Sequence, residues 1–404
     1  MRQHINNSDI KNPTKLLIVM CDDEEQVARE RSGHTAVVDG QYLYVWGGYV
    51  SVAHDEVFLR SDELWLYDLE TGLWIKHDMC GTIPPSMSGT CGCIVNGYLY
   101  IFGGCCDDGQ TNEHYSVSLQ DGKYMWRKLT RYRSGSLPSP RDKLSCWVHK
   151  GRMIYFGGYG HKRLNEINDP KSFVVDEASW AEEVFWGWNN EIHQFDPENC
   201  SWTEPQTFGH RPAPRAAHAG ATIGSKGYIC GGRIKETRTS DLFSMDMNSW
   251  TWSEIVPTTA VPLGRSWHTL TAVSDTSLFL FGGLSVDCRP MSDSWIYNLE
   301  TQGWNKMENP NQDKPRLWHT ACEGRDSDVI VFGGSHDYIL LVDTGHSKDV
   351  LVFQTQPYPL IRLCKDFIAS HARVFQNQIR HLPPKLRFAV QKRTTFFRPT
   401  TRKL

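Results

Sequence analysis

The sequence predicts an all-β protein, a six-bladed β-propeller followed by a small C-terminal helical segment. Six Gly-Gly doublets recur along the chain, separated by 56, 54, 74, 51 and 51 residues. A short run rich in aromatic and β-branched residues precedes each doublet, and such runs favour strands. After Pro357 the apolar residues change to helical spacing. A repeat of about fifty residues is typical of propellers, in which each repeat folds into one blade.

Each repeat contains the strands that a blade needs. The runs before the doublets are "YLYVW", "YLYIF", "MIYF", "GYIC", "LFLF" and "VIVF", and a second strand such as "ELWLYDLE" follows each doublet. A tryptophan marks a further strand in five repeats, at Trp74, Trp126, Trp202, Trp252 and Trp304. The sixth repeat lacks this tryptophan. We therefore expect its outer strand to come from the N-terminus, around Leu16 to Cys21, and to close the ring.

These patterns divide the chain into four parts. We expect an N-terminal extension at 1–24, the propeller at 25–356, helices at 357–392 and a basic disordered tail at 393–404. The 404 residues carry a net charge of −3, so neither a nucleic acid nor a membrane is predicted as partner. The twelve cysteines lack the spacing of a zinc site. We predict free thiols in a reducing compartment, the cytosol or the nucleus.

Four repeats open with Arg-x-x-His, a motif that begins at Arg31, Arg215, Arg265 and Arg316. Recurrence in a repeat fold favours a structural role, with hydrogen bonds at the inner edge of the ring, over ligand binding. The histidines come from separate blades and form no i,i+4 pair, so neither a metal site nor another cofactor is predicted.

Three features break the repeat. The third repeat opens with "DKLSCW" instead of Arg-x-x-His, which places Lys143 in the opening of this repeat. The same repeat carries about twenty extra residues that include Trp180, Trp186 and Trp188. An insertion of this size predicts a loop on one face, and its aromatic content predicts burial against itself or a ligand. The third feature is "CGGRIKETR", where Arg233 and Arg238 follow the fourth doublet.

Two arginines in one repeat indicate an anion site where loops converge on the central opening. Clustered cations are costly unless an anion is present, and we expect few acids in the neighbouring blade openings. The planar guanidinium suits a carboxylate or a phosphate. The neighbours expected from other blades are Lys143, Arg265 and Ser266. The alternative is that Arg233 and Arg238 pair with Glu236 or Asp241 on their own loop.

The stretch "PLIRLCKDFIASHARVFQNQI" predicts one amphipathic helix that begins near Pro359. Its apolar stripe comprises Leu360, Leu363, Cys364, Phe367, Ile368, Val374, Phe375 and Ile379. Packing against the propeller is one interpretation. The other is a BC box, the helix by which substrate receptors bind elongin B and elongin C, because Leu360, Cys364 and Ile368 fall at i, i+4 and i+8.

The next stretch, "HLPPKLRFAV", resembles a cullin box, which selects the cullin of the complex. Leu382, Pro383 and Leu386 match its pattern. Lys385 stands where the cullin-5 version of the box has its last proline, so the choice between cullin-2 and cullin-5 stays open.

The repeats resemble the kelch β-propeller, and together with the helices they resemble the family of kelch domain-containing proteins 1 and 2. The resemblance rests on "YVWGGYV", "DKLSCWV", "YFGGYG", "PRAAH", "GRSWHTL" and "PRLWHTAC" and covers about Glu24 to Phe388. It implies a non-catalytic substrate receptor of a cullin–RING ubiquitin ligase. Such receptors join elongins B and C to cullin-5 or cullin-2 with a RING subunit, and they bind client proteins that end in glycine.

The same resemblance implies the residues of the client site. Arg233, Arg238 and Ser266 match the residues that bind the terminal carboxylate, and Tyr49, Lys143, Tyr159, Trp188 and Trp267 match those of the surrounding pocket. Two arginines and a hydroxyl can saturate a carboxylate. Aromatic walls exclude a side chain and so select glycine.

Two other function classes remain as alternatives. A kelch scaffold without a ligase role would use the helices only as support. A propeller enzyme is the other. The repeated Ser-x-Asp-x-Gly-x-Thr-Trp motif of sialidases is not found in this sequence, and the predicted reducing compartment disfavours a copper oxidase.

Overall fold

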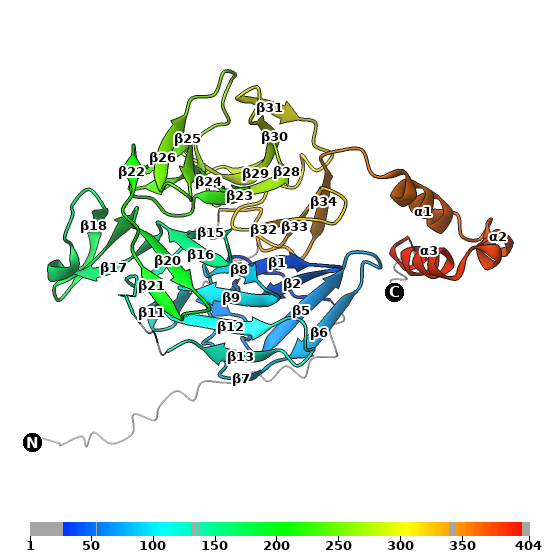
Figure 1. The fold of residues 1–404 in the computed structure, drawn as a ribbon, viewed down its shortest axis with the longest axis horizontal. Coiled ribbons are helices and arrows are strands. Elements are labelled where there is room, and N and C mark those ends of the chain that lie inside the picture. The colour runs from blue at the N-terminus through cyan, green and yellow to red at the C-terminus, as the bar shows by residue number, and fades with distance from the viewer. Residues whose placement is uncertain are drawn as a thin grey trace, which may run out of the picture.

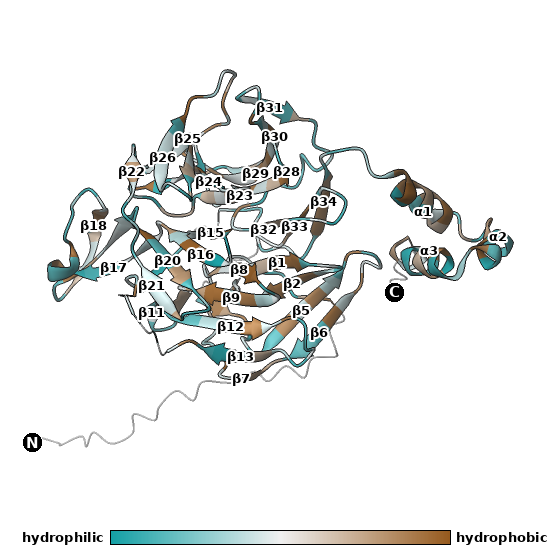
Figure 2. Ribbon diagram, in the orientation of Figure 1, coloured by the Kyte–Doolittle hydropathy of each residue, from teal (hydrophilic) through white to brown (hydrophobic). Residues whose placement is uncertain are grey.

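The computed structural model describes residues 27–53, 55–130, 132, 134–135, 137–338 and 345–397. Within these ranges the chain forms six blades around a centre, and three α-helices project beside blades 1 and 6 (Figure 1). The inner strands of the blades are largely hydrophobic (Figure 2). The predicted all-β six-bladed propeller with a small C-terminal helical segment is confirmed.

The first three blades are four-stranded antiparallel sheets. Blade 1 contains β1 (Thr35–Asp39), β2 (Tyr42–Trp46), β5 (Glu63–Asp68) and β6 (Trp74–Asp78). Blade 2 contains β8 (Cys91–Val95), β9 (Tyr98–Phe102), β12 (His114–Ser118) and β13 (Met125–Lys128), and β7 (Cys80–Gly81) adds a parallel edge. Blade 3 contains β15 (Ser145–His149), β16 (Arg152–Phe156), β20 (Ile192–Asp196) and β21 (Ser201–Thr203).

The last three blades follow the same order. Blade 4 contains β23 (Ala219–Ile223), β24 (Lys226–Ile234), β25 (Thr237–Asp246) and β26 (Thr251–Ile255), with β22 (Phe208–Gly209) as parallel edge. Blade 5 contains β28 (Thr269–Ser274), β29 (Ser277–Ser285), β30 (Pro290–Asn298) and β31 (Gly303–Met307). Blade 6 contains β32 (Thr320–Glu323), β33 (Asp328–Phe332) and β34 (Val350–Gln354). The closing strand expected around Leu16 to Cys21 lies outside the described residues.

The predicted tryptophans lie on outer strands and pack against the preceding blade. Trp126 of blade 2 lies 5.4 Å from Trp46 of blade 1, measured between ring centroids. Trp252 of blade 4 lies 5.1 Å from Phe156 of blade 3. The repeated tryptophan therefore joins neighbouring sheets into one core.

Short paired segments extend one end of the ring, which we call the pole. They comprise β3 (Tyr49–Val52) with β4 (Asp55–Phe58), β10 (Cys105–Cys106) with β11 (Gly109–Gln110), β27 (Arg265–Ser266) against β29, and the far ends of β24 and β25. Except for β27, which precedes the doublet of its repeat, they follow the Gly-Gly doublets. Only a residue without Cβ fits at such a doublet. At Gly232 a Cβ would come within 2.8 Å of the Cβ of His218, and the backbone φ is +108°.

The insertion of the third repeat is a sheet, which corrects our prediction of a loop. This sheet contains β17 (Tyr159–Arg163), β18 (Phe173–Ala181) and β19 (Val184–Asn189), with a 3₁₀ turn at Leu164–Glu166, and β14 (Arg141–Asp142) from the opening of the repeat pairs with β17 at its edge. Glu182 and Glu183 both have positive φ, as a two-residue hairpin turn requires. The expected burial holds for Trp188 but not for Trp180, whose side chain is 69% exposed.

Six backbone hydrogen bonds close a ring around the central axis. In each bond an amide of one blade donates to the carbonyl of the preceding blade, over 2.8 to 3.0 Å. The six residues are Gly33, Gly89, Lys143, Ala217, Trp267 and Trp318, and all have φ between +52° and +69°. Four of them are not glycine, and this backbone region costs free energy for other residues.

Three of the four recurring histidines join their blade to the blade before it. Nε2 of His34 lies 2.7 Å from Oγ1 of Thr320, and Nε2 of His218 lies 2.9 Å from Oγ of Ser145. Nε2 of His319 likewise lies 2.9 Å from Oγ1 of Thr269. These bonds support the structural interpretation of the Arg-x-x-His repeat.

Replacing Ala219 by serine is expected to raise the free energy of unfolding by about 1 kcal/mol. In three other blades, the residue at the position of Ala219 carries a hydroxyl that bonds the histidine of the following blade. Ala219 has no hydroxyl, and the histidine of the blade that follows it is His268. Urea unfolding of the wild type and the variant measures the difference. The Ala219→Val variant adds volume without a hydroxyl and is the control. A serine variant no more stable than the wild type would contradict the inter-blade role of the hydroxyl.

The stretch that we predicted as a single C-terminal helix forms two helices, α1 and α2, and a third helix, α3, follows them. α1 (Leu360–Ser370) ends where the Ser370 hydroxyl donates to the carbonyl of Phe367, which competes with the helical hydrogen bond. α2 (Gln376–His381) follows, and α3 (Pro384–Phe396) begins directly after Pro383.

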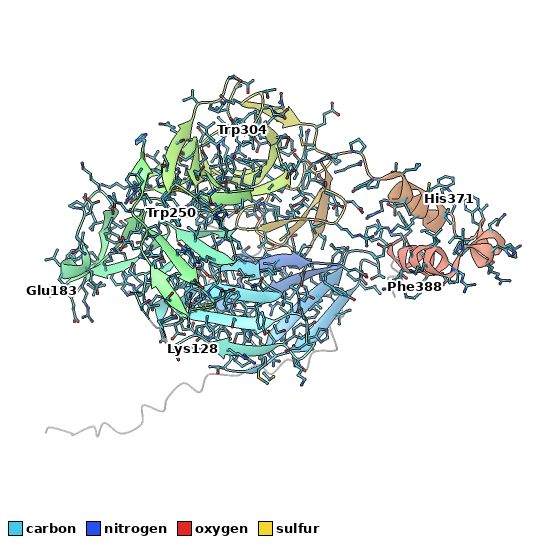
Figure 3. The ribbon with its side chains drawn as sticks, viewed as in Figure 1. Lys128, Glu183, Trp250, Trp304, His371 and Phe388 are labelled. Atoms are coloured by element: carbon cyan, nitrogen blue, oxygen red, sulfur yellow. The ribbon has the colours of Figure 1, made fainter. Side chains whose placement is uncertain are left out.

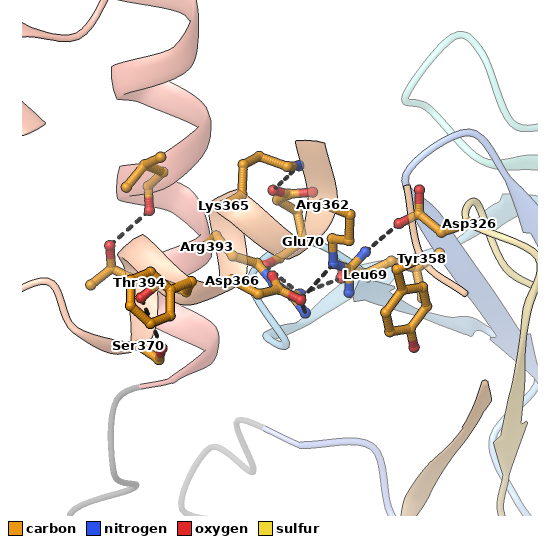
Figure 4. Close-up of polar contacts among 12 residues, drawn as sticks. Leu69, Glu70, Asp326, Tyr358, Arg362, Lys365, Asp366, Ser370, Arg393 and Thr394 are labelled. Carbon is orange, nitrogen blue, oxygen red and sulfur yellow. Dashed lines mark hydrogen bonds and ion pairs between the residues drawn. The ribbon is translucent and has the colours of Figure 1, made fainter. Parts of the chain in front are cut away.

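α3 extends beyond the boundary at residue 392 that we expected for the helices. Arg393 is buried, and its guanidinium donates to the carboxylate of Asp366 at 2.6 Å and to the carbonyls of Leu69 and Glu70 (Figure 4). Arg393 therefore belongs to the interface between the helices and blade 1, not to a solvated tail. Residues 398–404 lie outside the described ranges.

Candidate functional site

A cavity of about 290 Å³ opens at the pole of the propeller. Seven of the eight residues predicted for the client site line it, namely Tyr49, Lys143, Tyr159, Trp188, Arg233, Ser266 and Trp267. The eighth, Arg238, lies directly behind Ser266, because its Nε donates to the Ser266 hydroxyl at 2.9 Å. The volume of the cavity lies at the lower end of the range for small-ligand pockets.

The backbone ring around the axis holds three of the large side chains at this cavity. Lys143, Trp267 and Trp318 belong to the ring of left-handed residues and also line the cavity. Residues held in a costly backbone conformation cluster at ligand sites, where a rigid surrounding structure imposes the conformation. This arrangement fixes the cavity before a ligand arrives.

The cavity has aromatic walls on two sides. The rings of Tyr159 and Trp188 meet edge to face at 5.3 Å, because β17 and β19 place them directly opposite each other. The indoles of Trp267 and Trp318 stack at 5.4 Å with an angle of 23°. Burial raises the pKa of Tyr159 to about 12, so its hydroxyl stays protonated at neutral pH.

Arg233 and Arg238 face each other across one hairpin. They are paired residues in the register of β24 and β25, and like charges at directly opposite positions are destabilising. Arg238 is only 7% exposed. Its guanidinium bonds the Ser266 hydroxyl, the carbonyl of Val286 and, at 3.9 Å, the sulfur of Cys288. Within the described ranges no carboxylate pairs with Arg238, so this buried cation lacks a counter-charge.

The alternative of local ion pairs holds only weakly for Arg233 and fails for Arg238. A terminal nitrogen of Arg233 lies 3.5 Å from the carboxylate of Glu236, whose side chain is 94% exposed. Such exposed pairs contribute little. Asp241 does not bond Arg238, because Arg215 of the Arg-x-x-His repeat binds it through two nitrogens at 2.7 and 2.8 Å.

Arg265 does not join this cation cluster, contrary to our expectation. Its guanidinium binds the carboxylate of Asp293 at 2.7 and 2.9 Å and is buried. Arg215 and Arg265 of the repeated motif thus pair with an acid of their own blade, whereas Arg238 has no such partner among the described residues.

The expectation that acids are sparse near Lys143 was wrong. Lys143 forms an ion pair with the buried carboxylate of Asp142, the residue directly before it. Burial raises the pKa of Asp142 although Lys143 opposes this shift. The Lys143 ammonium also lies 5.3 Å from the ring centre of Trp318. Lys143 therefore contributes a hydrogen-bond donor to the cavity rather than an uncompensated charge.

Eight lining residues escaped the sequence prediction, and the four with large or charged side chains are Trp318, Asp142, Asp176 and Glu56. Trp318 could have been found, because it has the same position in "RLWH" that Trp267 has in "RSWH". Asp176 and Glu56 had no such signal. They reach the cavity only because β18 and the β3–β4 hairpin bend over the pole.

The residues predicted for elongin and cullin binding lie on the helices, away from the cavity. Leu360 is 76% exposed, Cys364 is exposed, and Ile368 is half-buried on the same stripe of α1. Leu382 is half-buried, and Pro383 and Leu386 are exposed at the start of α3. The exposed stripe of α1 corrects the interpretation that its apolar face packs on the propeller.

The polar face of α1 makes the contact with the propeller instead. Arg362 pairs with Asp326 of blade 6, and Lys365 donates to Glu70 of blade 1 at 3.0 Å (Figure 4). A further cavity of about 470 Å³ lies at this junction.

The described residues show three further features. Their cysteines are all free thiols. They contain no group of three or more histidine, cysteine, aspartate or glutamate side chains arranged to hold a metal ion. Nor does any helix among them have both the length and the apolar character needed to cross a membrane.

Comparison with known proteins places the chain in a family. The KLHDC2/KLHL20/DRC7 Kelch-repeats domain matches residues 33–283 and 187–359. Kelch domain-containing protein 1 of Mus musculus is 51% identical over 375 residues, which cover 92% of both chains. The Homo sapiens protein of that name is 52% identical with the same coverage, and kelch domain-containing protein 2 of Bos taurus is 42% identical over 90% of both chains.

A solved structure supports the fold. The structure of YjhT aligns with a TM-score of 0.56 at 16% identity, over 81% of this chain and 96% of that one. At this identity the likeness concerns the fold alone. The family match covers more than half of the chain, and the relatives align over nine-tenths of it. The protein therefore belongs to the KLHDC2/KLHL20/DRC7 kelch-repeat family.

Proposed function

We propose that the protein is a non-catalytic substrate receptor of a ubiquitin ligase, in which the cavity at the pole of the propeller binds the C-terminal glycine of client proteins. The observation that carries the proposal is the cross-strand pair of Arg233 and Arg238 beside the cavity, with Arg238 buried and without an acid partner in the described chain. A terminal carboxylate would supply the missing charge and relieve the repulsion.

The cavity walls support glycine as the terminal residue. Arg233, Arg238 and Ser266 together present enough donors for both oxygens of one carboxylate. The stacked indoles of Trp267 and Trp318 leave a narrow, rigid wall next to Ser266. A side chain on the terminal residue would collide with such a wall, so glycine is selected by exclusion. Lys143 is placed to donate to a backbone carbonyl of the client.

The helices support the ligase part of the proposal. The stripe of Leu360, Cys364 and Ile368 is left uncovered because charged residues on the opposite face hold α1 to the propeller. Such a stripe at i, i+4 and i+8 can enter the groove of a partner, which we assign to elongin C bound to elongin B. Leu382, Pro383 and Leu386 would then contact cullin-5 or cullin-2, which carries the RING subunit.

Peptide binding tests the proposal directly. Fluorescent ten-residue peptides that end in glycine are titrated with the full chain, each with a free and an amidated C-terminus. The free acid is expected to bind and the amide to lose at least about 30-fold in affinity, because the buried arginine then lacks its anion. Equal binding of both forms would contradict the proposed site.

Replacing both Leu360 and Cys364 by aspartate is expected to abolish co-purification of elongins B and C, because two charges cannot enter an apolar groove. Peptide binding should stay intact, since the cavity lies at the pole. Val256→Asp, at another apolar side chain that is 76% exposed, is the control and should keep the elongins. A double variant that still retains the elongins would favour the scaffold alternative.

A further inference from the structure

The cavity is lined by charges of both signs that come from different blades. Arg233 and Ser266 lie on blades 4 and 5, Glu56 lies on the β3–β4 hairpin of blade 1, and Asp176 lies on β18 of the third repeat. In a six-bladed ring, blade 1 stands opposite blade 4 and blade 3 is the neighbour of blade 4, so Glu56 stands across the ring from Arg233 and Asp176 lies on the adjacent side. Lys143 and Asp142, also in the third repeat, pair with each other.

Both outlying carboxylates retain the capacity to bind a cation. Neither Asp176 nor Glu56 forms an ion pair with any residue that the structure describes. Asp176 accepts two hydrogen bonds, from the Tyr159 hydroxyl at 3.0 Å and from the backbone amide of Ala178 at 3.2 Å. A carboxylate has about four acceptor sites, so about half of this capacity is unused. Glu56 is exposed on its hairpin and also lines the cavity.

The proposed binding mode determines which part of a client meets these acids. A client whose terminal carboxylate lies at Arg233 and Arg238 must lead its preceding residues out of the cavity, past the other walls. Two unpaired carboxylates stand on those walls and attract a positive side chain. We infer that Asp176 and Glu56 select clients that carry a lysine or arginine shortly before the terminal glycine. This inference rests on the proposed function and names its substrate class.

The energy of such a contact is modest, because both acids are partly exposed to solvent. Exposed ion pairs contribute roughly 0.2–1 kcal/mol each, which corresponds to a preference of about 1.4-fold to fivefold for one pair. The preference should weaken with added salt, since screening acts on exposed charges. The carboxylate clamp at the buried Arg238 should depend less on salt.

A charge scan tests the inference with the full chain. Ten-residue peptides that end in glycine carry lysine, alanine or glutamate at one upstream position at a time, and their affinities are measured at low and high salt. At one or more positions, lysine should bind at least about threefold more tightly than glutamate. Asp176→Asn and Glu56→Gln should each lower this lysine-to-glutamate ratio. Glu183→Gln, at the tip of the same insertion, is the matched control and should leave the ratio unchanged (Figure 3).

The outcomes separate the inference from the function on which it rests. Equal affinity for lysine and glutamate peptides at every position would overturn the inference, while loss of binding on amidation would still support the carboxylate clamp. If amidation had no effect, the proposed function itself would fail. A uniform loss for all peptides in Asp176→Asn, with an unchanged ratio, would show that Asp176 only positions Tyr159 and would remove it from the inferred site.

Discussion

Replacing Arg238 by glutamine is expected to lower the affinity for a glycine-ended peptide at least about 30-fold without destabilising the protein. Removal of one partner of a buried, hydrogen-bonded charge pair costs about 2 to 5 kcal/mol of binding free energy. In the free protein, however, Arg238 lacks an acid partner among the described residues and faces Arg233 across the hairpin. Its neutralisation therefore removes a repulsion and leaves the free energy of unfolding unchanged or higher.

Two measurements check this prediction, peptide titration and urea unfolding of the same preparation. Lys235→Gln is the matched control, because it removes one exposed charge from the turn of the same hairpin. Its peptide affinity should change by less than about threefold. A glutamine variant at Arg238 that keeps its affinity, or that loses stability as well as affinity, would assign this arginine a structural role.

Acidification from pH 7 to pH 5 is expected to destabilise the propeller strongly. Burial lowers the pKa of His114, His218 and His319 from the ordinary 6.5 to about 3. These side chains stay neutral in the folded protein at pH 5, whereas the unfolded chain binds a proton at each. The folded state therefore loses stability as pH falls below 6.5, by about 2 kcal/mol per histidine at pH 5. The sum of about 6 kcal/mol approaches the whole stability of many domains.

Urea unfolding at pH 7, 6 and 5 measures this loss. The buried carboxylates paired with arginines do not produce it. Despite burial, the hydrogen bond from Arg215 lowers the pKa of Asp241, so its contribution is lost only below the ordinary carboxylate range. His319→Gln should reduce the loss of stability between pH 7 and pH 5 by about 2 kcal/mol, the share of this one histidine. Equal stability at pH 7 and pH 5 would contradict the prediction.

Much of the architecture could be predicted because each blade repeats its own local pattern. The apolar runs, the doublets and the tryptophans specify strands and turns within about fifty residues, so neighbouring blades need only stack. The departure at Arg233 and Arg238 was visible for the same reason, since a residue absent from the other copies is not required by the fold.

The local pattern could not show which charges meet. The sequence alone does not distinguish Arg265 from Arg238. In the structure, Asp293 of the same blade neutralises Arg265, whereas no acid among the described residues neutralises Arg238. The pairing of Lys143 with Asp142 depends on the left-handed backbone that the ring imposes on Lys143. These outcomes depend on which side chains meet in the folded blades, which sequence spacing does not encode.

The sequence by itself determined the six-bladed fold, the departure of one hairpin from the repeat and the apolar stripe that begins at Leu360. Only the tertiary structure decided that this stripe is exposed, that Arg393 is buried, and that Asp176 and Glu56 line the same cavity as Arg233. The physical reason is one of range. Hydrophobic periodicity acts along the chain, whereas burial and charge compensation depend on residues that lie far apart in sequence and meet only after the ring has formed.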